Sequence, residues 1–174
     1  MKYDREFLRH LVEYTIFADA AGFEAAATLP EDEYYAARNF SFGSIHNLLV
    51  HQMVAQKTWL RRWMGEVFVG RLENHTEHPT RPLLQERWAK VHADLLDFVS
   101  SQTSESLNKV MTVRRGDGEL ITAPLGAMVM HVADHGSYHR GQLASMLKQA
   151  GVAKPPYTPY FRFAIQHAAE GKTT

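Results

Sequence analysis

Three histidines recur at four-residue intervals in the stretch HVADHGSYHRGQL, which holds His131, His135 and His139. Residues four apart lie one above the other on the same face of an α-helix. This is the spacing with which two imidazoles of one helix hold a single metal ion. With roughly 100° per residue and Leu125 as the reference, His139 falls inside the apolar arc, His135 at its edge and His131 further out.

A histidine in an apolar stripe is costly unless its ring nitrogens are satisfied. Either a metal ion or ordinary hydrogen bonds could satisfy them, and the spacing alone leaves both open. The zinc-protease motif requires a glutamate directly after its first histidine, but Val132 and Gly136 stand at that place in the two overlapping windows. A metalloprotease is therefore disfavoured.

A metal ion needs a further ligand from another segment, and SIHNLLVHQM offers His46 and His51. His51 falls nearer the apolar stripe of its expected helix and near the middle of that helix, where ligands in bundle cores lie. His46 is expected to be solvated or to cap the helix. His75 and His78 fall in a connector and are expected to be exposed.

These residues must be positioned by long helices, because apolar residues recur at three- and four-residue steps through most of the chain. The fold class expected is all-α, a four-helix bundle with a short hairpin before the fourth helix and a short C-terminal helix. The whole chain, 1–174, is expected to form one domain. The long connector at 65–82 and the hairpin leave the order of the helices open. The expected helices cover about 3–29, 41 or 44 to 64, 80–102, 122–151 and 160–169, and the hairpin is expected at 110–122. The candidate caps are Ser41 or Ser44 for the second helix, Thr80 for the third and Thr122 for the fourth.

Composition excludes several classes of protein. Lys plus Arg and Asp plus Glu number 19 each, so no nucleic acid and no acidic membrane surface is expected as a partner. The chain has no cysteine, which excludes disulfides, thiolate ligands and cysteine nucleophiles. It has no apolar run of about 18 residues and no signal-peptide core, so a cytoplasmic protein is expected.

SFGSIHNLLVHQMVAQKTWLRRW, followed about 80 residues later by HVADHGSYHRGQL, resembles the DinB/YfiT-like family over nearly the whole chain. The most specific part is the H-x-x-x-H-R-G-Q run. The resemblance implies a bundle of up-down-down-up topology in which three histidines bind a divalent metal, here His51, His135 and His139. Relatives often carry an acidic residue shortly after the G-V-x-P-P segment, where this chain has YTPYFRF.

Three imidazoles would leave coordination positions free for water or substrate. Imidazole suits several metals, and zinc or nickel is expected, with zinc slightly ahead. Because relatives include thiol-dependent S-transferases, a maleylpyruvate isomerase and proposed hydrolases, the resemblance implies a metal-dependent enzyme acting on a small molecule, with a low-molecular-weight thiol as a candidate partner. The alternative is a non-catalytic, metal-stabilised bundle with a structural, sensory or stress-response role. A homodimer is also expected.

The sequence assigns no catalytic residue. Tyr138 is expected at the rim of the site, and Arg140 is expected to tie two helices together. Gly136 and Gly141 are expected to permit close helix packing. The three tryptophans lie on helical stripes and are expected in the core or an interface; they are Trp59, Trp63 and Trp88. The connector and the aromatic tail are candidates to shape a pocket over the metal or to bury a dimer surface.

Overall fold

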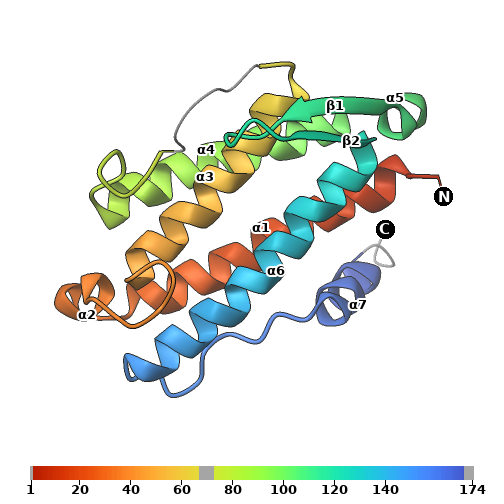
Figure 1. Ribbon diagram of the computed structural model, residues 1–174. Helices are drawn as coiled ribbons and strands as arrows, with labels where there is room; N and C mark the ends of the chain where they lie inside the picture. The colour runs from red at the N-terminus through yellow and green to blue at the C-terminus, as the bar shows by residue number, and fades with distance from the viewer. Residues whose placement is uncertain (1, 67–72, 171–174) are drawn as a thin grey trace.

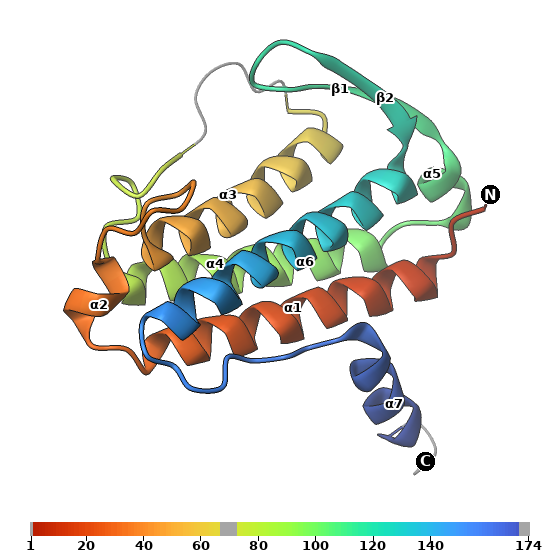
Figure 2. The same ribbon diagram turned by 60° about the horizontal axis from the view of Figure 1, so that its bottom comes forward.

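Four long helices form the body of the molecule in a computed structural model that describes residues 2–66 and 73–170 (Figure 1). Helix α1 packs against α4 and α6, and α3 packs against the same two, so α1 and α3 lie diagonally opposite. Figures 1 and 2 show α1 and α6 running in one direction and α3 and α4 in the other. This is the up-down-down-up topology that was expected. The four helices are α1 (Arg5–Ala27), α3 (Ile45–Trp63), α4 (Arg81–Ser100) and α6 (Leu125–Gln149).

Side-chain caps fix where three of these helices begin. Asp4, Ser44 and Thr80 each accept a hydrogen bond from a backbone N–H in the first turn, which satisfies a donor that has no partner within the helix. Ser44 is therefore the cap of α3. The expectation that Thr122 caps α6 is wrong, because the preceding strand continues to Pro124 and keeps Thr122 extended.

The hairpin is present as β1 (Val110–Arg114) and β2 (Leu120–Pro124), paired antiparallel with Val110 opposite Pro124. Its turn closes at Gly118, whose φ of +91° favours glycine. Figure 2 shows the hairpin on the opposite side of the bundle from α7 (Tyr160–Glu170), the expected C-terminal helix.

Two short helices were not expected from the sequence. They are α2 (Glu31–Tyr35) and α5 (Ser104–Asn108). Each has five residues, which is too short for a hydrophobic period to show.

The core fills the space between the four long helices. All three tryptophans are buried, as expected. Gly126 at the start of α6 lies against Tyr3, since a Cβ at that position would come 2.3 Å from the Tyr3 Cγ atom. Within 2–66 and 73–170, no helix has the length and apolar character to cross a membrane. The expectation of one domain stays a prediction.

Candidate metal centre

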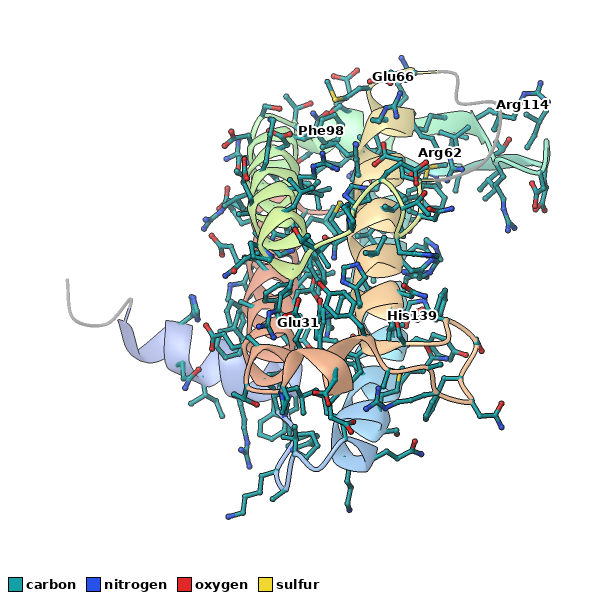
Figure 3. The ribbon with its side chains drawn as sticks, turned by 90° about the vertical axis from the view of Figure 1, so that its left-hand side faces the viewer. Glu31, Arg62, Glu66, Phe98, Arg114 and His139 are labelled. Carbon is teal, nitrogen blue, oxygen red and sulfur yellow. The ribbon has the colours of Figure 1, made fainter. Side chains whose placement is uncertain are left out.

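Imidazoles from two neighbouring helices meet at one point between α3 and α6. The Nε2 atom of His139 lies 3.2 Å from that of His51 and 3.0 Å from that of His135. One candidate ligand atom from each of the three lies within 4.8 Å of the others. Figure 3 shows His139 where α6 meets α3. The structure thus brings together the three histidines that the sequence indicated.

The protons on these rings favour a shared cation. Nδ1 of His139 lies 2.8 Å from the amide oxygen of Gln142, so Nδ1 carries the proton and Nε2 presents its lone pair. That lone pair can accept a hydrogen bond from at most one neighbouring Nε2–H group, so at least one of the two short nitrogen–nitrogen contacts is not satisfied by a proton. One ion placed among the three nitrogens would satisfy all of them. The donor set therefore fits a divalent metal of the kind that prefers imidazole.

All three imidazoles titrate at lower pH than a free histidine. Burial, with the nearby His139 as a smaller contribution, lowers the pKa of His51 from 6.5 to about 4. Burial and then the neighbouring histidines lower the pKa of His135 to about 4. Burial also lowers the pKa of His139, against a hydrogen bond to Gln142 that raises it. The rings are neutral at pH 7, as ligands must be.

Aromatic side chains surround the group. Phe42, in the loop before α3, stacks on His51 with ring centroids 4.3 Å apart and meets His139 edge-on. Tyr138 is 65% exposed at the rim, where its hydroxyl accepts a hydrogen bond from Gln142. His131 is exposed and lies outside the group of three, with its ring against Trp59 at 5.1 Å.

A pocket of about 520 Å³ reaches two of the three histidines from the hairpin side. Its walls come from one face of α3, from α6 and from the hairpin turn. A second pocket, of about 310 Å³, reaches His51 from the loop before α3 and from residues 73–75. The lining of the first pocket is His51, Ala55, Thr58, Trp59, Arg62, Arg115, Gly116, Asp117, Ile121, His131 and His135.

A buried ion pair joins α6 to α1. Arg140 donates to Asp19 of α1 over 2.8 Å, with both side chains nearly or fully buried. Gln56 and His92 also reach the Asp19 carboxylate, at 2.6 and 3.4 Å. Burial acts to raise the pKa of Asp19, but the hydrogen bond with His92 and the charge of Arg140 outweigh it, so the pKa is lowered. The expectation that Arg140 ties two helices together is confirmed.

Two histidine expectations were wrong. His46 is only 2% exposed, because its ring lies between the hydroxyl of Tyr34 and the backbone oxygen of His78, at 3.1 and 2.8 Å. His78 is fully buried and contacts Glu73 and Arg87 at 2.8 and 3.0 Å. The end of the connector folds against the bundle there, a long-range contact that no local sequence pattern indicates.

Of the expectations for His75, Gly136 and Gly141, the first two are confirmed and the third is wrong. His75 is exposed, as expected. Gly136 is in close contact, since an added Cβ would come within 2.8 Å of the Arg140 guanidinium, but nothing lies within 4 Å of a Cβ at Gly141. Close packing therefore explains Gly136 and not Gly141.

The connector and the aromatic tail were expected to shape a pocket over the metal or to bury a dimer surface. Residues 67–72 of the connector fall outside the described residues. The aromatic tail packs on α1, where Phe163 contacts Tyr14 and Ala18, and it lies away from the three histidines of the candidate metal centre. The homodimer stays a prediction.

Sequence reasoning missed Phe42, Gln142 and Asp19. Gln142 stands three residues after His139, a spacing that puts it on the same helical face, so it was within reach of the sequence. Asp19 is an acid next to the apolar stripe of α1, which is a weaker signal. Nothing in the sequence indicates that Phe42 lies over His51.

Comparisons with known proteins identify the family of this chain. The family model described as "DinB family" matches residues 2–170. "Protein DinB" of Bacillus subtilis (strain 168) is 26% identical over 157 residues, which cover 87% of this chain and 90% of that protein. The crystal structure of a DinB-like protein from Bacillus subtilis superimposes with a TM-score of 0.59 at 15% identity, covering 85% of this chain and 96% of the other. The chain belongs to the DinB family.

Proposed function

We propose that His51, His135 and His139 bind one divalent metal ion and that the protein is a metal-dependent enzyme of the thiol-dependent S-transferase or hydrolase type. Zinc or nickel is the proposed metal, because three neutral imidazoles suit both. The observation that carries the proposal is the convergence of three Nε2 atoms beside a pocket of about 520 Å³. A bound ion would supply a Lewis acid for a substrate oxygen and would lower the pKa of a thiol or water.

The pocket favours the enzyme over the metal-stabilised bundle. A purely structural site is closed, whereas His51 and His135 both line a space large enough for a small molecule. The walls combine apolar area from Trp59 and Ile121 with a few polar groups, which is typical of small-molecule sites.

The chain's own residues prepare the site in three ways. Gln142 fixes the tautomer and the ring orientation of His139 through its amide oxygen. Phe42 stacks on one face of His51. The Arg140–Asp19 pair fixes the turn of α6 that carries His139 against α1.

Elemental analysis of untagged protein purified without added metal tests the ligand set. We expect one zinc or nickel ion per chain in the wild type and in His131→Ala, and none in His135→Ala. His131→Ala is the matched control because it removes an imidazole from the same helix face outside the group of three. Stoichiometric metal in His135→Ala would overturn the proposed ligand set.

A panel of small thiols with electrophilic acceptors, run beside a panel of esters and amides, tests the enzyme. We expect turnover by the metal-loaded wild type and loss of turnover in His135→Ala. If the wild type binds metal, is stabilised by it and turns over neither panel, the metal-stabilised bundle becomes the better account.

A further inference from the structure

Arg62 is a buried cation in the wall of the pocket. It lies near the C-terminal end of α3 and is only 8% exposed. Its guanidinium carbon lies 5.1 Å from the centroid of the Trp59 ring, one turn closer to His51. Figure 3 shows Arg62 and His139 on the same side of the bundle, below the hairpin that carries Arg114.

This guanidinium has a buried N–H group without a hydrogen-bond partner among the described residues, and the repulsive charge of Arg115 acts on it more strongly than the attractive charge of Asp117. Among the residues that the structure describes, none accepts a hydrogen bond from the buried Nε atom of Arg62. None of the ion pairs within 2–66 and 73–170 includes Arg62. An arginine stays protonated at neutral pH, and burial of a charge without a counter-ion is unfavourable. An anion entering the pocket would remove that cost.

The other charged residues that line the pocket are less suited than Arg62 to bind an anion. Arg115 also lines the pocket, but it is paired within the hairpin with Glu119 at 2.8 Å and Asp117 at 3.5 Å. Asp117 is the only acid among the described lining residues, and no described ion pair joins it to Arg62. Arg62 is therefore the one lining cation without a described ion-pair partner.

A continuous wall joins Arg62 to the histidines. Trp59 lies under the guanidinium, His131 meets the edge of Trp59, and the His131 and His135 rings are 5.9 Å apart. Arg62 follows His51 by eleven residues, or roughly 16 Å of helix, and its side chain leans back toward the N-terminus of α3. The separation between guanidinium and imidazole along this wall is on the order of 10 Å. That span suits a small molecule with one charged end.

We infer that Arg62 is the anion-binding residue of this pocket and that the substrate carries a carboxylate, held by Arg62, with an apolar segment lying along Trp59 and Ile121. A guanidinium matches a carboxylate with two parallel hydrogen bonds, which makes the planar fork of arginine a specific reader of that group. This inference rests on the proposed function only in assigning the carboxylate to the substrate of the histidine site. The binding of a carboxylate by Arg62 does not depend on a metal.

The test is therefore made on chelator-treated, metal-free protein. Hexanoate and hexanamide are the probes, because they share a chain and differ in charge, and dissociation constants are measured by ligand-observed NMR. The variants are Arg62→Gln, Arg62→Lys and the matched control Arg61→Gln. Arg61 is the adjacent arginine, bonded to Glu66 over 2.6 Å and absent from the pocket lining, so its loss changes net charge equally.

We expect the wild type and Arg61→Gln to bind hexanoate at least several-fold tighter than hexanamide. We expect Arg62→Gln to bind hexanoate roughly tenfold or more weakly than the wild type, with no change for hexanamide. If Arg62→Gln does not fold, the affinity of Arg62→Lys for hexanoate tests whether Arg62 binds the carboxylate. It keeps the charge but not the fork, so its preference for hexanoate is expected to persist at reduced affinity.

Equal affinity of the wild type for the two probes would overturn the inference. An equal loss in Arg61→Gln and Arg62→Gln would also overturn it, because net charge would then explain the result. The metal content of the wild type answers the separate question of the histidine site, so a protein that binds no metal and still selects hexanoate through Arg62 would refute only the proposed function.

Discussion

Replacement of Arg140 by methionine isolates the buried ion pair that fixes α6 to α1. Methionine keeps much of the apolar stem and removes the charge that faces Asp19, a carboxylate with no exposed side-chain surface. Loss of one partner from a buried pair costs about 3–5 kcal/mol, because the other charge is left uncompensated. Gln56 and His92 still contact the carboxylate, so we expect the lower end, about 3 kcal/mol, at pH 7.

The loss should depend on pH in a definite direction. In the wild type the pKa of Asp19 is lowered, so the pair stabilises the fold above the ordinary aspartate value of about 3.9 and the stabilisation fades as the pH falls below it. In Arg140→Met, burial is opposed by fewer partners and raises the pKa of Asp19 relative to the wild type. Protonation of Asp19 then removes the uncompensated charge in the variant. The loss in its free energy of unfolding relative to the wild type is therefore expected to be smaller at pH 5 than at pH 7.

Urea unfolding of the metal-free proteins, followed by circular dichroism at both pH values, measures the effect. Asp19→Asn combined with Arg140→Met should recover most of the lost free energy, since neither charge remains. Lys90→Met is the control, because the exposed Lys90–Asp94 pair contributes about 0–1 kcal/mol. A loss below about 1 kcal/mol at pH 7, or the same deficit at both pH values, would refute the reasoning.

Four further predictions concern the metal site and the helix α6. The metal-free wild type should lose stability as the pH falls from 6.5 to about 4, because His51 and His135 stay neutral when folded while the unfolded chain takes up protons. After discounting for partial exposure, the loss is about 1–2 kcal/mol per histidine, and a flat profile of Tm against pH would contradict it. Gln142→Leu should weaken metal affinity by roughly 10- to 100-fold, measured by chelator competition, while leaving the unfolding midpoint of the metal-free protein nearly unchanged. Gly141→Ala should stabilise the fold by about 0.5–1 kcal/mol in thermal unfolding, because its Cβ meets nothing and alanine favours a helix. Gly126→Ala should destabilise it by about 1–3 kcal/mol, because its Cβ overlaps a tyrosine ring, and equal effects of the two changes would argue against the packing described.

The bundle and its histidines were predictable because their signals are local or belong to the family. Spacing of four residues on one helix identified His135 and His139 as a pair, and the helix periodicity placed both at the core edge. His51 was different, since its position on its helix was only suggestive. The family resemblance, and not the periodicity, singled it out.

What the sequence could not supply depends on contacts between distant segments. His46 and His78 are buried because the end of the connector folds onto α3, a contact between residues 32 positions apart. The lack of a partner for Arg62 is likewise a property of the assembled pocket, since no spacing along α3 reveals which carboxylates approach it. Thr122 was misplaced as a cap because a strand and a helix compete for the same residues, and strand pairing with Thr112 prevailed.

Pro124 is at once the last residue of β2 and the residue that starts α6. No residue separates the two, so the hairpin that lines the pocket is joined directly to the helix that carries His135 and His139. The loop at 115–119 is free of that constraint. Replacing the 115–119 loop by loops of other length or charge would change the entrance of the pocket and leave His51, His135 and His139 in place. This loop is therefore the position at which to alter the selectivity of the pocket.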